Sequence, residues 1–250
     1  MAGPENKDNL FKICQSIEGI KVIYDCGSRD ALDGLELMSK LNAEELHVFE
    51  CNPAAIRLCK TNINSYSGIG KIYMNELAVS DKEGELSFNS IDPEKTVTPH
   101  SDGNIGASSL FEPNQNYSKE SYKTNRISVK ATSLDAYHLS HHRPPDLLWI
   151  DLQGAELDAL QGGISILKNI KIIHVEVTFR QIYKNQALFY QVHNFLKRDF
   201  KLYKLANIPF LERLIRSSAG NINRFINFGH WFTNAIYVNK SLSEFENVTK

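Results

Sequence analysis

Two acidic residues stand where two neighbouring strands of a parallel sheet would end. The runs 21–28 (KVIYDCGS) and 46–53 (LHVFECNP) are short, apolar and closed by turn residues, as buried parallel strands are. The segment between them is expected to be a crossover helix. Asp25 and Glu50 should therefore lie at the carboxyl edge of the sheet, where doubly wound folds bind their ligands.

The chemistry of these acids favours a ligand with a ribose and a positive charge but no phosphate. The carboxylate of Glu50 can accept hydrogen bonds from both hydroxyls of a ribose. Asp25 puts negative charge where a dinucleotide fold presents only backbone to a pyrophosphate. S-adenosylmethionine meets this description, so these residues predict it as the cofactor. Gly27 would let the backbone approach the cofactor closely, although a tight turn alone would also require a glycine.

Two later strands, 147–151 (LLWID) and 170–177 (IKIIHVEV), bring further carboxylates to the same edge. Asp151 is the leading catalytic candidate, because a hydroxyl acceptor must lose a proton and a partly desolvated carboxylate can take it. Capping of the following helix is the other interpretation of Asp151, and Glu156 in the first turn of that helix has the same two interpretations. Glu176 is the second catalytic candidate. Together with Asp151 it could bind a divalent metal, but two carboxylates are too few to predict one.

Hydrophobic periodicity organises the 250 residues as one α/β domain. Residues 1–20 form a leading helical segment. Asn52 is expected to cap a helix that begins at the next residue, and 71–79 is expected to be a single strand. Residues 89–125 lose apolar periodicity, which is typical of a polar insert that is either disordered or a functional lid.

Composition excludes several classes of protein. The net charge of −1 leaves no electrostatic footprint for nucleic acid, and no apolar run is long enough to span a membrane. The chain start shows no secretory signal, and the four cysteines form no CxxC pair, so reduced thiols and a cytoplasmic location are expected. The irregular stretch 206–230 could be a lid, a dimer contact or ordinary packing, which leaves a homodimer open.

Four stretches of this chain resemble the FkbM family of S-adenosylmethionine-dependent methyltransferases, over residues 21–238. The segment 25–31 (DCGSRDA) resembles the D-x-G turn of the family, with Ala31 in the place of a second glycine. The matching segments that follow are 49–53 (FECNP), 78–81 (AVSD) with 106–110 (GASSL), and 146–156 (DLLWIDLQGAE). The last resembles D-x-x-K-I-D-V-E-G-A-E, from which Trp149 and Gln153 depart. If the family's lysine contacts substrate, the acceptor here is less anionic or more aromatic.

The resemblance implies a class I methyltransferase fold, which is Rossmann-like, with helices on both faces of a seven-stranded, mostly parallel sheet whose last strand is antiparallel. It implies that S-adenosylmethionine methylates a hydroxyl of a sugar, glycan or secondary metabolite. Backbone amides of Ala78 and Val79 would face the adenine, and Ser28 and Cys51 would also lie in the cofactor site. Asn52 would contact the adenosine or only cap its helix.

Other functions remain to be compared with this one. A nicotinamide-dependent dehydrogenase would need G-x-G-x-x-G after the first strand, and residues 26–31 supply one glycine. Enzymes that methylate amino groups of nucleic acids carry N/D-P-P-Y/F at the fourth strand, which residues 151–154 do not match. A non-catalytic binding module and an N-methyltransferase of the same fold stay as alternatives. His174, between apolar neighbours, is expected to be a buried histidine rather than a base.

Overall fold

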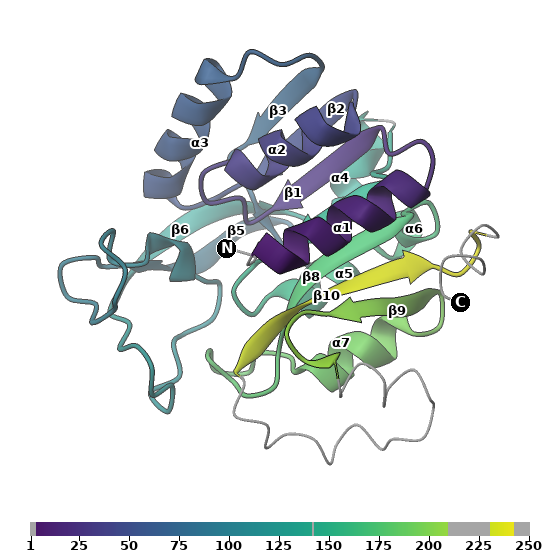
Figure 1. The fold of residues 1–250 in the computed structure, drawn as a ribbon. Helices are drawn as coiled ribbons and strands as arrows, with labels where there is room; N and C mark the ends of the chain where they lie inside the picture. The colour runs from purple at the N-terminus through teal and green to yellow at the C-terminus, as the bar shows by residue number, and fades with distance from the viewer. Residues whose placement is uncertain (1–3, 142, 210–230, 243–250) are drawn as a thin grey trace.

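Seven strands form one sheet in the order β3-β2-β1-β7-β8-β10-β9 (Figure 1). The computed structural model describes residues 4–141, 143–209 and 231–242. The strands of this sheet are β1 (Val22–Cys26), β2 (Glu45–Phe49), β3 (Lys71–Asn75), β7 (Leu147–Ile150), β8 (Ile172–Thr178), β9 (Phe200–Leu205) and β10 (Phe232–Asn239). The pairs β1–β2, β2–β3, β1–β7 and β7–β8 are parallel, whereas β10 runs antiparallel to both β8 and β9. The predicted mostly parallel sheet with an antiparallel last strand is confirmed.

Successive residues of the central strands pack on opposite faces of the sheet, and helices cover both faces. Tyr24 and Leu148 belong to the apolar cluster on one face, and their neighbours Ile23 and Trp149 belong to the cluster on the other. On the Ile23 face lie α1 (Pro4–Ser16), α2 (Leu32–Leu41) and α3 (Pro53–Ser65). On the Tyr24 face lie α4 (Leu134–His141), α5 (Glu156–Gln161), α6 (Ile164–Leu167) and α7 (Phe189–Leu196). Burial on both faces explains why β1 and β7 are apolar runs.

The single strand expected over residues 71–79 is wrong. β3 ends at Asn75, and β4 (Ala78–Val79) belongs to a second sheet of three strands, in the order β4-β6-β5 with β5 (Gly84–Ile91) and β6 (Thr124–Thr132). The Asn75 side chain donates to the backbone carbonyls of Val48 and Tyr73, and the backbone carbonyl of Asn75 accepts from the N–H of Glu50. These bonds hold Asn75 at the end of β3, so the chain turns away before Ala78 and can pair with β6.

The insert at residues 89–125 contacts the rest of the protein through hydrogen bonds and through apolar side chains, such as Tyr117, which packs in a cluster with Ile182 and Tyr183. Its ends lie in β5 and β6, and it contains the short 3₁₀ helix η1 (Ile105–Ala107). Isolated bridges join Asn89 to Ser109 and Pro113 to Tyr183. The insert stands beside the end of the sheet to which the parallel strands point (Figure 1). Whether it moves as a lid stays a prediction.

Two further expectations concern the membrane and the irregular stretch at 206–230. Within residues 4–141, 143–209 and 231–242, every helix is too short or too polar to cross a membrane. Residues 210–230 lie outside the described residues. They make up most of the stretch that was expected to be a lid, a dimer contact or ordinary packing.

Candidate active site

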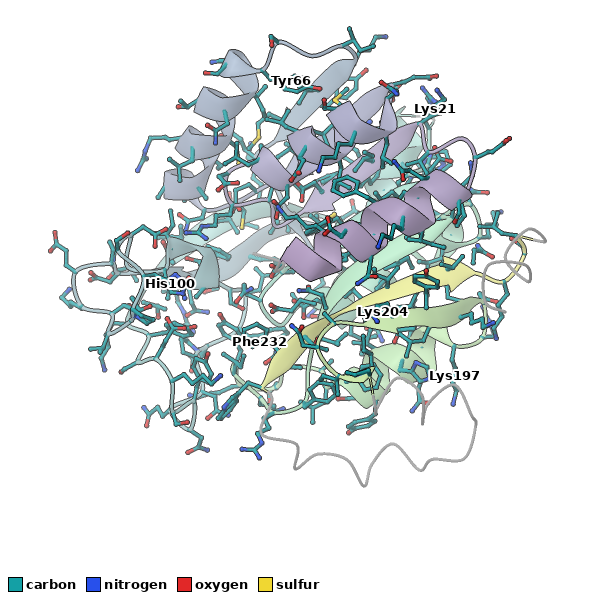
Figure 2. The ribbon with its side chains drawn as sticks, viewed as in Figure 1. Lys21, Tyr66, His100, Lys197, Lys204 and Phe232 are labelled. Carbon is teal, nitrogen blue, oxygen red and sulfur yellow. The ribbon has the colours of Figure 1, made fainter. Side chains whose placement is uncertain are left out.

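Two cavities open at the carboxyl ends of β1, β2 and β7. The first has an empty volume of about 490 Å³, counting its mouth, and its lining includes Glu50, Cys51, Asn52, Ala78, Val79 and Leu110. The second, of about 1050 Å³, has a lining that includes Asp25, Ser28, Tyr117, Trp149, Glu176 and Phe232. Figure 2 labels Phe232 at the start of β10, together with His100 of the insert, which also lines the second cavity. The residues that line both cavities are Gly27, Arg29, Gly106, Asp151 and Gln153, so the two cavities meet at the ends of β1 and β7.

Glu50 is held in the wall of the first cavity by three backbone N–H groups. Its Oε1 accepts from Cys51 and Asn52, each at 2.8 Å, and its Oε2 accepts from Arg29 at 2.9 Å. Burial raises the pKa of this carboxyl, and the three N–H donors lower it by stabilising the charge. A carboxylate offers about four acceptor positions. One position therefore remains for a ligand, on Oε2.

Asn52 joins helix α3 to the insert. Its Oδ1 accepts from the N–H of Ala54 at 3.0 Å, and Pro53 occupies the first helical turn, so the predicted helix cap is confirmed. Its Nδ2 donates to Ser108 Oγ at 2.9 Å and to the Ile105 carbonyl at 3.3 Å. Both polar atoms of this buried side chain are thus bonded within the protein, and contact with an adenosine stays a prediction.

An apolar wall completes the first cavity. Ala78 and Val79 of β4 are buried, and Ala78 packs in a small apolar cluster with Phe88, Leu110 and the half-buried Cys51. All five line the cavity. A slot that combines apolar side chains with a single hydrogen-bonding carboxylate matches a nucleoside, whose base is mostly apolar on its faces and whose sugar carries hydroxyls.

Asp25 lies buried at the second cavity and accepts a hydrogen bond from Ser28 Oγ. Burial raises the pKa of Asp25 to about 7, the bond from Ser28 lowers it, and the charges of Asp33 and Asp30 raise it further. Gly34 of α2 is so close that a Cβ there would lie 2.7 Å from Asp25 Oδ2. Because Asp25 titrates near neutral pH, a cation bound in the second cavity would hold it ionised.

Gly27 is required by the backbone that crosses it. Its φ is +82°, and a Cβ at this position would lie 1.8 Å from the carbonyl oxygen of Asp151. The N–H of Gly27 donates to the Phe49 carbonyl at 3.0 Å, and the N–H of Asp151 donates to the Cys26 carbonyl at 2.9 Å. The sequence suggested that the cofactor needs this space. In the structure, the protein itself fills the place of the missing Cβ.

Three acids gather at the ends of β7 and β8. Carboxylate oxygens of Asp151, Glu156 and Glu176 lie within 4.8 Å of one another, which is close enough to hold a metal ion. Burial raises the pKa of all three groups, that of Glu156 to about 7, and the negative charge of Asp151 raises the pKa of Glu176 further. The amide of Gln153 donates to Asp151 Oδ1 at 2.6 Å, which lowers the pKa of Asp151 in opposition to burial. Asp151 is thus the carboxylate of this group that is best stabilised as an anion by a side chain.

The model of the FkbM methyltransferase domain matches residues 25–203 of this chain. The match begins at Asp25, near the end of β1, and ends within β9, so it includes every acid described above. The chain belongs to the FkbM methyltransferase family. This match confirms the resemblance to a methyltransferase family that the sequence predicted.

One relative of this FkbM protein is the 2-O-methyltransferase NoeI of Sinorhizobium fredii, which is 26% identical over 172 residues. The matched region covers 66% of this chain and 66% of the relative, so the chain spans slightly less than two thirds of the relative's length. One similar solved structure is that of an rRNA methylase from Streptococcus thermophilus, which is 10% identical in sequence and gives a TM-score of 0.46. The match covers 96% of this chain and 98% of the methylase chain. TrmK of M. capricolum with S-adenosylhomocysteine has 9% identity, covers 93% of this chain and 68% of that chain, and gives a TM-score of 0.43. At TM-scores below 0.5, these likenesses carry no inference about the substrate.

Positions at which this FkbM protein departs from the family pattern lie at or near the site. Trp149 lines the second cavity, with its ring centroid 3.9 Å from that of His174. Burial lowers the pKa of His174 to about 3, so its imidazole stays neutral, as expected of a buried histidine. Ala31, which replaces a usual glycine, has a φ of +65°, a left-handed conformation that glycine adopts at lower cost. Cys51, which replaces a usual proline, lines the first cavity, and Gln153 lies where the two cavities meet.

Sequence reasoning missed most of the lining that the insert supplies. Ile105 and Leu110 line the first cavity, and Tyr117 and Tyr122 line the second. The block 106–110 was the signal available for this segment, because it matches the family. The two tyrosines follow no apolar periodicity, so the sequence alone does not indicate that they face the site.

Proposed function

We propose that this protein transfers a methyl group from S-adenosylmethionine to a hydroxyl of a sugar, glycan or secondary metabolite. The observation that carries the proposal is the meeting of the two cavities at Asp151. One cavity has the apolar wall and the carboxylate that suit an adenosine, and the other is open, acidic and partly aromatic. A carboxylate at their junction stands between a cofactor on one side and an acceptor on the other.

The donors and the shape of the first cavity fit the adenosine part of the cofactor. Glu50 retains one acceptor position, which can serve one ribose hydroxyl, while Cys51, Ala78 and Val79 supply apolar surface for the base. Asn52 fixes the wall by bonding to the insert. When bound there, S-adenosylmethionine supplies a methyl group attached to a positively charged sulfur.

The second cavity offers negative charge to the methionine part. Asp25 and Ser28 line it together with Gly27, and Asp25 would accept from the ammonium of the methionine moiety. Among the described residues, neither Asp25 nor Asp151 forms an ion pair with a lysine, arginine or histidine. A cationic ligand would therefore find carboxylates that no described side chain already holds in an ion pair.

Asp151 is the proposed proton acceptor, and Glu176 lies beside it. A carboxylate whose pKa is raised by burial is a better base than an exposed one, and general-base assistance contributes about 10²- to 10⁴-fold in rate. Alignment of the hydroxyl contributes more, since a near-attack arrangement can lower the barrier by about 7–11 kcal/mol. The residues that would supply this alignment are those of the second cavity, including the aromatic rings of Tyr117 and Trp149.

The hydroxyl specificity rests on two supports. The relative NoeI is named a 2-O-methyltransferase, which favours oxygen as the acceptor atom. The second cavity, of about 1050 Å³, is large enough for a small-molecule acceptor or for one end of a glycan. Its many carboxylates and the net charge of −1 disfavour nucleic acid as the acceptor.

The test uses Asp151→Asn, with Asp81→Asn in an exposed turn as the matched control. S-adenosylhomocysteine release is measured over a panel of sugars, sugar nucleotides and polyketide-like hydroxyl compounds, and over amines of the same size, with and without chelator. We expect release with hydroxyl acceptors. In Asp151→Asn turnover should fall by about 10²- to 10⁴-fold while affinity for S-adenosylhomocysteine, measured by calorimetry, stays unchanged. Wild-type turnover in this variant would remove Asp151 as the base, and release with amines alone would replace O-methylation by N-methylation.

A further inference from the structure

The side chain of Gln153 lies between two of the acids at the junction of the cavities. Its Nε2 is 2.6 Å from Asp151 Oδ1 and 3.4 Å from Glu176 Oε2. Its backbone has a φ of +52°, an uncommon conformation for a residue other than glycine. Since the amide NH₂ group is the only part of this side chain that can donate, it must face the two carboxylates.

The other end of the Gln153 side chain is held by Tyr183. The Tyr183 hydroxyl lies 2.9 Å from Gln153 Oε1 and 2.7 Å from the carbonyl oxygen of Ala107, so its single proton is shared between these acceptors. Tyr183 is 1% exposed, and Ser109 Oγ donates to the Gln153 carbonyl at 2.7 Å. The amide is therefore fixed by the loop after β8 and by the insert, and its direction does not depend on the acids that it contacts.

The third acid of the group is satisfied by the backbone. Glu156 Oε1 accepts from the N–H groups of Leu152 at 3.0 Å and Gly154 at 2.9 Å, and Oε2 accepts from Gly154 at 3.1 Å. A divalent cation needs oxygen lone pairs that converge on one point. Here backbone N–H groups meet Glu156, and the Gln153 amide meets one oxygen each of Asp151 and Glu176.

We infer that Gln153 is a positioning residue whose carboxamide lies between Asp151 and Glu176, in the place that a divalent cation bound to these two acids would take. The inference rests on the proposed role of Asp151 as proton acceptor. The amide holds Asp151 at the junction of the cavities and keeps Glu176 beside it. It does so without adding positive charge near the site of a cationic cofactor, where a dication would repel the sulfonium. Methyl transfer by this chain then needs no bound metal ion.

The test is Gln153→Glu. The new side chain has nearly the same shape and keeps an oxygen that can accept the Tyr183 proton. It replaces the NH₂ donor by an oxygen of a fourth carboxylate. Binding of Mn²⁺ to the protein without cofactor is measured by electron paramagnetic resonance, which reports coordination directly. The Gln153→Glu variant should bind Mn²⁺ with a dissociation constant of about 10⁻⁴ to 10⁻³ M, as weak oxygen sites do. Wild-type protein should bind at least about tenfold more weakly, a difference of about 1.4 kcal/mol.

Two controls assign the ion to this group of acids. The double variant Asp151→Asn/Gln153→Glu should return to the wild-type affinity, and Gln115→Glu, which adds the same charge at an exposed position of the insert, should show no gain. If Gln153→Glu is too unstable to titrate, Mn²⁺ should raise its melting temperature more than that of the wild type.

Equal Mn²⁺ affinity of the wild type and Gln153→Glu, or a gain that survives in the double variant, would overturn the inference. Its failure is separable from failure of the proposed function. Wild-type protein that binds no S-adenosylhomocysteine in calorimetry would refute the cofactor assignment, whatever Mn²⁺ does. The Mn²⁺ comparison alone decides whether the Gln153 amide fills a cation's place.

Discussion

Replacement of Gly27 by alanine tests how the ends of β1 and β7 are held together. The new Cβ would lie 1.8 Å from the carbonyl oxygen and 2.8 Å from the carbonyl carbon of Asp151. These are backbone atoms, and no rotamer change can move them away. The matched control is Gly84→Ala, because Gly84 also has a positive φ, of +98°, but a Cβ added there would meet no atom of a non-neighbouring residue within 4 Å. The two variants share the backbone strain and differ in the collision.

The magnitudes follow from these two contributions. A left-handed conformation costs an L-residue about 1–2 kcal/mol, which both variants incur. Forcing an extra methyl group into packed structure adds about 1–3 kcal/mol for Gly27→Ala alone. The free energy of unfolding should therefore fall by about 1–2 kcal/mol in Gly84→Ala and by about 2–5 kcal/mol in Gly27→Ala. For a chain of this size, each kcal/mol lowers the melting temperature by about 2–4 °C.

The assay is thermal unfolding of both variants, with calorimetric titration of S-adenosylhomocysteine. Gly27→Ala should lose both stability and affinity, with a dissociation constant raised by about tenfold or more, since the displaced Asp151 backbone belongs to both cavities. Gly84→Ala should keep its affinity within about twofold. Equal losses of stability in the two variants would refute the reasoning, because the collision with Asp151 would then contribute nothing.

Two further predictions concern the acids of the first two strands. Glu50→Ala should raise the dissociation constant of S-adenosylhomocysteine by about tenfold or more, because loss of a charged hydrogen bond costs about 1.5–3 kcal/mol. The control is Glu76→Ala, which removes an exposed ion pair with Lys60. Unchanged affinity of Glu50→Ala in calorimetry would contradict the ribose assignment. Asp25 has a folded-state pKa of about 7, above its unfolded value of 3.8. Its contribution to the free energy of unfolding is therefore fully present below pH 3.8 and is lost as the pH rises from 3.8 through about 7. Asp25→Asn should therefore gain stability relative to wild type between about pH 4 and pH 7 in urea unfolding, and a difference that is independent of pH would count against burial of this acid.

Strand positions and helix starts, which depend on the pattern of neighbouring residues, were predicted well. Apolar runs ended by turn residues located β1, β2 and β7, and the Asn52-Pro53 pair located the start of α3. The expected acids at strand ends lie at one edge, because parallel strands all end on the same side of a sheet. One local signal was overlooked. The apolar spacing changes from two to three between Met74 and Leu77, where β3 ends and the chain leaves the sheet.

Sequence alone determined the mainly parallel direction of the strands in the sheet and the acids at its carboxyl edge, because hydrophobic periodicity and turn chemistry are properties of neighbouring residues. Tertiary structure decided which loops meet there. The bond from Asn52 to Ser108 and the bridge of Gln153 between Asp151 and Glu176 join segments whose order along the chain does not reveal their contact. Hydrogen bonds between loops leave no periodic trace, since each needs only one donor and one acceptor at the right place. The role of Gly27 has the same origin: a glycine marks close approach, but only the folded chain shows that the Asp151 backbone is what approaches.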